Sequence, residues 1–289
     1  MAHSPLATPS ATLAVLKRFG LATKKSLGQH FLIDDNIVGR ILELADIGPD
    51  DVVLEVGPGI GTLTAALCEQ GAPVVAIERD AGLMPALSRT TAACPRLAVV
   101  RADAVTVSPA ELCEPFGAPT TLVANLPYGV AATVVLRFFE ELPTLRSATV
   151  MVQAEVADRM AAAPGGKEYG SYSVKLRLLA RPRCRFAVPR SCFLPPPRVD
   201  SAVLRLVRHP LSADAVLLAH AARVADSAFA QRRKTVRNSL KATLGIDVAA
   251  LDEALELAGI DGSLRAEVLE PERFLALAAQ LRGQLEAST

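Results

Sequence analysis

Four apolar segments in the first half of the chain each end at a glycine or a polar residue, and this repetition constrains the fold more than any other feature. The segments cover residues 52–56, 74–77, 97–101 and 121–124, and the residues that follow them include Gly57, Glu78, Asp103 and Asn125. Helical patterns separate the segments, as in a parallel sheet covered by helices. Ligands bind such sheets at the carboxyl ends of the strands, so we expect these four residues to share one binding edge.

The glycine turn after the first segment favours a nucleoside. Residues 57–61 read Gly-Pro-Gly-Ile-Gly and precede a predicted helix at 62–69. Glycine lets the backbone approach a ligand closely, but the spacing differs from the Gly-x-Gly-x-x-Gly of dinucleotide sites, and Pro58 lacks an amide that could meet a pyrophosphate. Glu78 can accept both ribose hydroxyls and Asp103 an adenine amine, although each also fits an ordinary acid at a strand end.

The sequence Asn125-Leu126-Pro127-Tyr128 suits the recognition of a nucleobase amine. The lone pair of such an amine is delocalised into the ring, so the nitrogen is a poor nucleophile until it is drawn towards tetrahedral geometry. An asparagine carbonyl and the backbone carbonyl before a proline can accept the two amino hydrogens, while a tyrosine stacks on the ring. The alternative is a proline turn in which the asparagine caps and the tyrosine covers the core.

The chain resembles the small-subunit (16S) ribosomal RNA adenine dimethyltransferases over nearly its whole length. The segments that carry the resemblance are 25–32, 55–61, 125–128, 169–170, 173–174, 193–203 and 231–240. The resemblance implies a Rossmann-like class I methyltransferase fold of the α/β class, with a mostly parallel sheet, helices on both faces and a smaller all-α C-terminal domain. It implies N6-dimethylation of two adjacent adenines in the 3′-terminal hairpin of small-subunit ribosomal RNA, and a role in subunit maturation.

The resemblance also implies roles for individual residues. Contacts to the cofactor, S-adenosyl-L-methionine, would come from His30, Leu32, Gly57, Gly59, Glu78, Asp103 and Asn125. The target adenine would first leave its base stack in the RNA. It would then be held by Asn125, Leu126, Pro127 and Tyr128, and Phe193 would stack on the other face of the adenine ring. Positioning should supply most of the rate. Many family members have asparagine in place of His30; without the resemblance, His30 reads as a loop residue and Phe193 as core.

Basic residues are clustered although the net charge is only +1. One cluster comprises Arg181, Arg183, Arg185, Arg190 and Arg198, and the other comprises Arg232, Arg233, Lys234, Arg237 and Lys241. A helix predicted at 232–244 would place Arg233 and Arg237 on one face, where they could neutralise phosphates. Solvated basic faces are the common alternative, but the resemblance favours RNA binding by Arg232, Arg233, Lys234 and Arg237.

The chain is expected to form two domains. Residues 1–209 are predicted to form the methyltransferase domain, with residues 1–20 as a loose tail, and residues 210–289 a helical RNA-binding domain. Strands are predicted at 173–179 and 202–207, and helices at 34–47, 155–163, 213–230, 232–244, 249–258 and 271–281.

Composition limits the cellular context. No apolar stretch approaches the roughly 20 residues that span a bilayer, and the start of the chain lacks the features of a signal peptide. The five cysteines are scattered and show no metal-ligand spacing. We therefore expect a cytoplasmic protein, without a metal or a membrane. The resemblance implies the small ribosomal subunit and its RNA as the partner, and we expect the protein to be a monomer.

Other functions fit parts of the pattern. The glycine turn and Glu78 would allow an NAD-dependent oxidoreductase, but no catalytic histidine, Tyr-Lys pair or cysteine is suitably placed. A non-enzymatic ribosome assembly factor could keep the fold and the basic helices, whereas the presence of Asn125 and Tyr128 favours catalysis. Relatives that act on large-subunit RNA share the cofactor motifs, but residues 231–240 resemble the small-subunit branch.

Overall fold

The computed structural model describes residues 3–22, 29–209, 213–231 and 233–286, and the chain divides into two compact units. The first unit comprises Met1–Ala157 and Pro182–Arg208, and the second comprises Asp158–Arg181 and His209–Thr289. The second unit thus resumes close to the predicted boundary at residue 210. It also contains residues 158–181, which the sequence prediction assigned to the methyltransferase domain.

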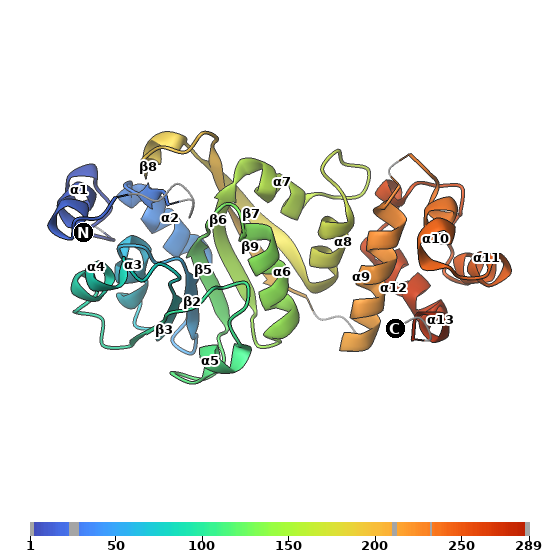
Figure 1. Ribbon diagram of the computed structural model, residues 1–289, viewed down its shortest axis with the longest axis horizontal. Coiled ribbons are helices and arrows are strands. Elements are labelled where there is room, and N and C mark those ends of the chain that lie inside the picture. The colour runs from blue at the N-terminus through green and yellow to red at the C-terminus, as the bar shows by residue number, and fades with distance from the viewer. Residues whose placement is uncertain (1–2, 23–28, 210–212, 232, 287–289) are drawn as a thin grey trace. The chain divides into compact units, whose positions relative to one another are not determined.

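A seven-stranded sheet forms the centre of the first unit (Figure 1). Its strands, in spatial order, are β4 (Leu97–Val100), β3 (Val74–Ile77), β2 (Val53–Val56), β5 (Thr121–Asn125), β6 (Ser147–Gln153), β9 (Ser201–Arg208) and β7 (Ala180–Val188). The first five are parallel, and β9 is antiparallel to β6. A separate antiparallel pair joins β1 (Phe31–Leu32) to β8 (Phe193–Leu194).

The register of the parallel strands brings their carboxyl ends together. Val56 pairs with Ile77, and Ile77 pairs with Val100. Strands β2 and β3 are buried at every position, as expected for parallel strands covered on both faces. Because these strands end level with one another, the residues that follow them lie at the same edge, as the sequence predicts.

Helices cover both faces of this sheet. The helices of the first unit are α1 (Pro9–Arg18), α2 (Asp35–Ala45), α3 (Thr62–Cys68), α4 (Met84–Thr90), α5 (Pro109–Cys113), α6 (Ala131–Glu141) and, across the division, α7 (Ala154–Ala161), together with the short η2 (Arg190–Cys192). Helix α2 packs on β5, β6 and β9, and α6 crosses the opposite face, in front in Figure 1. The side chain of Asp34 caps α2 by accepting from the amides of Asn36 and Ile37.

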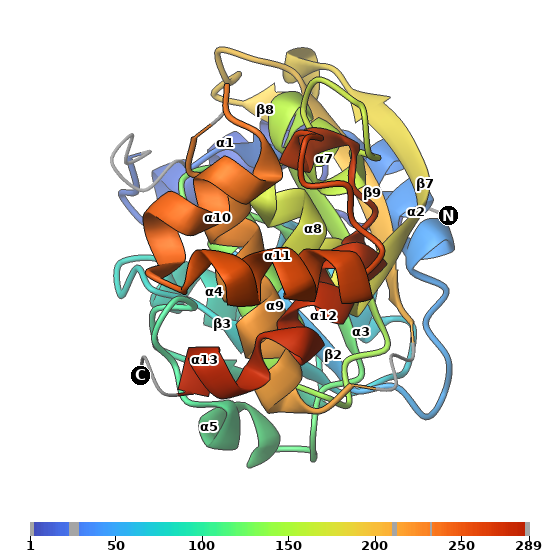
Figure 2. The same cartoon turned by 90° about the vertical axis from the view of Figure 1, so that its right-hand side faces the viewer.

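The second unit is helical (Figure 2). Its elements are α8 (Ser171–Leu179), α9 (Ala215–Phe229), α10 (Val236–Leu244), α11 (Val248–Leu257), η3 (Ala266–Val268), α12 (Pro271–Gln280) and α13 (Arg282–Glu286). Helix α9 lies at its centre, in contact with α8, α10 and α12, and Phe274 is fully buried in the shared core. None of the helices in the described ranges combines the length and apolar character needed to cross a membrane.

The strand predicted at residues 173–179 is wrong, because this segment forms helix α8. Its sequence alternates apolar and polar residues from Val174 to Leu178, which imitates the period of a strand. Tertiary packing selects the helix: Val174 and Leu178 are buried against α9 and α12. The strand next to β9 in the sheet is instead β7.

The loose tail predicted at residues 1–20 is also wrong. Thr8 caps helix α1 by accepting from the amide of Ala11. Leu16 is 8% exposed and packs in a cluster with Phe31 and Ile60. The start of the described chain is attached as well, because the amide of Ser4 donates to Asp35 Oδ1 at 2.7 Å.

Helix α1 should therefore contribute to stability through one face only. Leu16→Ala should lower the free energy of unfolding by about 2–3 kcal/mol, because it leaves a cavity under the helix. Leu13→Ala is the matched control. Because Leu13 is 53% exposed, this substitution should change the free energy of unfolding by no more than about 0.5 kcal/mol. Urea unfolding measures both, and equal effects would mean that α1 is not docked in solution.

Candidate active site

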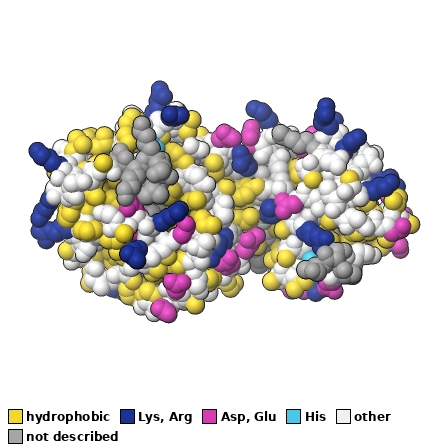
Figure 3. All heavy atoms as spheres, in the orientation of Figure 1, with side chains coloured by type: hydrophobic (Ala, Val, Ile, Leu, Met, Phe, Trp, Pro, Cys, Tyr) yellow, Lys and Arg dark blue, Asp and Glu magenta, His cyan; other side chains and the backbone are white. Residues whose placement is uncertain are grey.

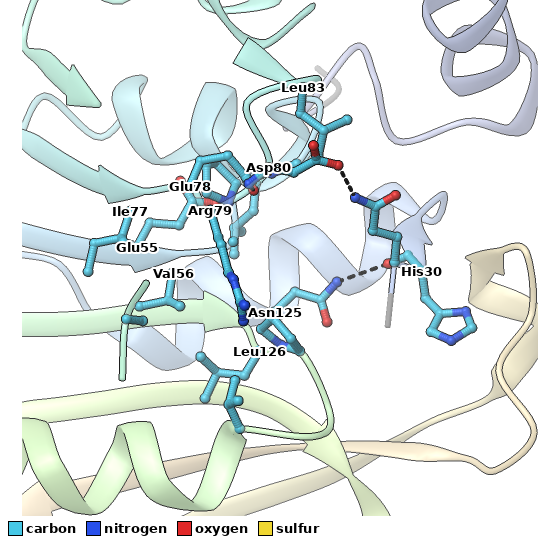
Figure 4. Close-up of a pocket in the computed structure, with 18 of the residues that line it drawn as sticks. His30, Glu55, Val56, Ile77, Glu78, Arg79, Asp80, Leu83, Asn125 and Leu126 are labelled. Carbon is cyan, nitrogen blue, oxygen red and sulfur yellow. Dashed lines mark hydrogen bonds between the residues drawn. The ribbon is translucent and has the colours of Figure 1, made fainter. Parts of the chain in front are cut away.

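A cavity of about 370 Å³ lies at the edge of the sheet where β2, β3, β4 and β5 end. Its wall also includes the segment that enters β1 (Figure 4). The predicted site residues that line it are His30, Leu32, Gly57, Gly59, Glu78, Asp103, Asn125, Leu126, Pro127 and Tyr128. The structure thus collects residues that span almost a hundred positions of the sequence.

The glycine turn forms one wall of the cavity. Gly57 and Gly59 have φ of 70° and 61°, a region that other residues rarely adopt. A side chain at Gly59 would also place a Cβ 3.2 Å from the Phe31 ring. Both positions therefore require glycine, and the backbone at this turn is exposed to whatever the cavity holds.

Glu78 is held by backbone amides. Its Oε2 accepts from the amide of Gly59 at 3.1 Å, and its Oε1 accepts from the amide of Asp80 at 2.7 Å. The residue is 5% exposed, and desolvation raises its pKa despite these bonds. A carboxylate has about four lone-pair directions, so both oxygens can still accept hydroxyl groups from a ligand.

Glu55 is a second acid in the cavity wall, and the sequence analysis did not identify it. It lies inside β2, is 1% exposed and lines the cavity. Desolvation raises its pKa to about 8, and the charge of Glu78 adds to the shift. No described residue gives Oε2 a hydrogen-bond partner. A glutamate within an apolar strand was the available signal, since an acid there is costly unless it has a use.

Asp103 and Asp80 belong to a polar border of the cavity. Asp103 forms an ion pair with Arg79 at 3.1 Å and accepts from the amide of Val105. Asp80 accepts from Gln29 Nε2 at 2.8 Å, shown as a dashed line in Figure 4. Arg79, Asp80 and Gln29 line the cavity but were not predicted, because each is an ordinary surface residue type within a loop.

His30 contacts both Asn125 and Tyr128. Asn125 Nδ2 donates to the backbone carbonyl of His30 at 3.3 Å (Figure 4). The rings of His30 and Tyr128 are stacked, with centroids 5.5 Å apart and planes 25° apart. The Tyr128 hydroxyl is hydrogen-bonded to Ser201 Oγ at 2.7 Å, and His30 Nδ1 donates to the carbonyl of Pro195 at 2.8 Å. His30 therefore supports the predicted base-binding residues in addition to lining the cavity.

Phe193 is not part of this wall, contrary to the sequence prediction. It is 1% exposed and packs in the core with Leu32 and Val123. It pairs with Leu32 across the β1–β8 ladder, and this pairing holds the β1 segment in place. The described conformation thus gives Phe193 the core role that its sequence alone indicated, and gives no support to it as a stacking face.

The predicted RNA-binding residues are arranged differently from a single helical stripe. Helix α10 begins only at Val236, and Thr235 is its N-cap. The Thr235 side chain accepts a hydrogen bond from the backbone amide of Asn238. Arg233 and Lys234 are exposed in the turn before it, and Arg237 is paired with Asp252, with Nη2 to Oδ2 at 2.7 Å. Arg232 lies outside the described residues. The shared helical face of Arg233 and Arg237 is therefore wrong, and RNA binding by these residues stays a prediction.

Cysteines and acids show no further site. All five cysteines are free thiols. Within the described ranges, no three His, Cys, Asp or Glu side chains are grouped as metal ligands would be.

The fold and the cavity define the class of protein. A mostly parallel seven-stranded sheet in which the antiparallel strand β9 lies next to the terminal strand β7, with a glycine turn and an acid after successive strands, is the fold of the class I methyltransferases. The solved 23S rRNA methyltransferase ErmE is 30% identical, with a TM-score of 0.65 over 87% of this chain and 99% of that one. A dimethyladenosine transferase from Plasmodium falciparum, 23% identical, matches the fold with a TM-score of 0.71 over 88% of this chain and 98% of its own.

Sequence comparison identifies the family. The ribosomal RNA adenine dimethylase family matches residues 20–282. The ribosomal RNA small subunit methyltransferase A of Rhodococcus opacus is 46% identical over 96% of this chain and 95% of its own length. The protein of the same name from Shouchella clausii is 41% identical over 98% of both chains. The chain belongs to the ribosomal RNA adenine dimethylase family, and the protein is an adenine-N6 methyltransferase of ribosomal RNA.

Glu55 should give the ligand-free protein a pH-dependent stability. Its pKa of about 8 in the folded state lies above the ordinary value of 4.5, so between these values the folded protein holds a proton that the unfolded chain has lost. The free energy of unfolding therefore falls as pH rises through this window. Glu55→Gln should remove that slope. Between about pH 5 and about pH 8, the free energy of unfolding of this variant should therefore rise relative to that of the native protein, by on the order of a few kcal/mol.

Urea unfolding at several pH values measures this difference. Glu43→Gln, a change on the exposed side of α2, controls for the loss of a carboxylate at the surface. Parallel pH profiles for the native protein and Glu55→Gln would show that Glu55 ionises normally in the fold.

Proposed function

We propose that the protein transfers methyl groups from S-adenosyl-L-methionine to N6 of two adjacent adenines in the 3′-terminal hairpin of small-subunit ribosomal RNA, and that it contributes to subunit maturation. The observation that carries the proposal is the meeting of Asn125 and Tyr128 with Glu78 and Asp103 around one cavity. The names of the Rhodococcus and Shouchella relatives support the small subunit as the target. We expect the protein to act as a cytoplasmic monomer on this partner.

The cavity has the groups that the donor requires. Glu78 would accept the ribose hydroxyls and Asp103 the adenine amine, while Gly57 and Gly59 leave room for the nucleoside against the backbone. When bound, S-adenosyl-L-methionine supplies an electrophilic methyl group on a sulfonium. Glu55 and Glu78 have raised pKa values, and a cation in the cavity would stabilise their ionised forms. An unpartnered buried oxygen on Glu55 fits a site whose ligand provides the missing hydrogen bond or charge.

The target amine would be held by acceptors of fixed direction. Because Asn125 Nδ2 donates to His30, the Oδ1 of the same amide is available as an acceptor. The backbone carbonyl of Leu126, next to Pro127, would accept the second amino hydrogen. These two bonds would localise the nitrogen lone pair and direct it at the methyl carbon of a bound donor. The sulfonium would leave as a neutral thioether when the N–C bond forms, and the proton lost by the amine would pass to water.

The ring of the target adenine would stack on the Tyr128–His30 pair. The Tyr128 side chain is tied at its hydroxyl by Ser201, and its ring is supported by His30. Burial raises the pKa of the Tyr128 phenol, so this ring stays neutral. Fixing the plane of an aromatic platform beforehand reduces the entropy lost when a base stacks on it.

Asn125→Ala tests the assignment of the amine-binding role. Methyl transfer to small subunits that lack the modification should fall by about 100- to 1,000-fold, the usual effect of losing one preorganised polar group. Donor affinity measured by calorimetry should change little, because the contacts of Glu78 and Asp103 remain. Asn36→Ala, an exposed asparagine, is the control. Undiminished turnover by Asn125→Ala would reject the role given to this side chain.

His30 variants test the stacked pair separately. His30→Phe keeps an aromatic ring against Tyr128 but loses the bond to Pro195, whereas His30→Ala loses both. Since aromatic pairs contribute about 0.5–1.5 kcal/mol, we expect His30→Ala to lower kcat/KM for the RNA by roughly tenfold and His30→Phe to recover most of it. Steady-state kinetics with small subunits measures both variants, and equal impairment would show that the ring contact is unimportant.

A further inference from the structure

We propose that strand β7 is a second RNA-binding surface, which binds the phosphate backbone of the substrate beside the active site. The inference rests on the proposed function. Positive and negative side chains are both spread over the face seen in Figure 3, in keeping with the net charge of +1. Against this mixed background, residues 180–200 contain five arginines and one acid, Asp200.

The strand fixes where its arginines point. Side chains alternate across a strand, and Phe186 and Val188 pack into the core beneath α2. Arg183 and Arg185 therefore project from the opposite face, and both are exposed. On the core side, the Arg40 guanidinium covers Phe186 at 3.8 Å from the ring centroid. Both sides of this strand are thus basic at the surface.

The position of β7 in the sheet leaves it open to a partner. It is the terminal strand, next to β9, and Figure 2 shows it along the margin near α2. Residues two apart in a strand are separated by about 6.6 Å, which is comparable with the repeat between successive phosphates of a nucleic acid strand. Guanidinium groups at this spacing can bind consecutive phosphates.

The chain leads directly from β7 to the active site. Strand β7 ends at Val188, and seven residues later the carbonyl of Pro195 accepts the bond from His30. Two further exposed arginines, Arg190 and Arg198, lie on either side of that contact in sequence. Asp200 is the acid of this segment, and its Oδ1 accepts a hydrogen bond from the backbone amide of Arg190 at 3.1 Å. An RNA whose target base enters the cavity would therefore have its flanking backbone near this segment.

Arginines on a terminal strand can also protect it from pairing with other sheets. That role requires charge of either sign, whereas RNA binding requires positive charge, so the two are separable. An apolar protein partner is disfavoured, because none of the large exposed hydrophobic side chains of the described residues lies in β7. A polyanionic backbone is the partner that this surface fits.

The test is Arg183→Glu combined with Arg185→Glu. We expect KM for small subunits to rise by roughly tenfold, and the slope of log affinity against log salt to decrease by about two, one for each lost phosphate contact. Donor affinity, unfolding and turnover at saturating substrate should be unchanged. Arg183→Lys with Arg185→Lys should retain most of the affinity. Arg89→Glu with Arg96→Glu makes the same charge change towards the β4 edge of the sheet, on exposed residues, and should have a much smaller effect.

Normal KM and an unchanged salt slope for Arg183→Glu combined with Arg185→Glu, in a protein whose native form methylates the subunits, would overturn the proposal. Absence of methylation by the native protein would instead reject the proposed function.

Discussion

The hydrogen-bond register of the parallel strands is the constraint on which the site depends. Because β2, β3 and β4 end level with one another, the glycine turn, Glu78 and Asp103 reach the same edge, and β5 adds Asn125 beside them. A slip of one residue would turn each side chain to the other face of the sheet. The buried, apolar interiors of these strands therefore determine the geometry of polar residues that lie just beyond their ends.

Different interactions dominate on the two sides of the cavity at this edge. Two carboxyl groups, Glu55 and Glu78, are removed from water beside the cavity, and their raised pKa values record the cost of holding negative charge there. On the other side, Asn125, Tyr128 and His30 form a supported group that presents an amide oxygen and an aromatic plane. One half of the cavity thus suits a cationic nucleoside, and the other suits a neutral base with an amino group.

Much of the fold and site could be predicted because the signals are local. Apolar runs and glycine turns identified the parallel strands, and the residues at and just after their ends include eight of the ten predicted residues that line the cavity. The other two, His30 and Leu32, came only from the family resemblance. The failures occurred where a local pattern supports two structures. The alternation in residues 173–179 suits a strand but is buried as a helix in contact with α9, and Leu16 reveals its role only through contacts with Phe31 and Ile60.

The sequence by itself determined the class of fold, the edge of the sheet at which the cavity lies and the residue types available there, because strand periodicity and turn chemistry act over a few positions. Only the tertiary structure decided that Phe193 is core, that His30 supports Tyr128, that Arg237 is paired with Asp252 and that β7 closes the sheet. The reason is physical: burial, stacking and ion pairing depend on neighbours brought from distant parts of the chain, and no short stretch of sequence specifies those neighbours.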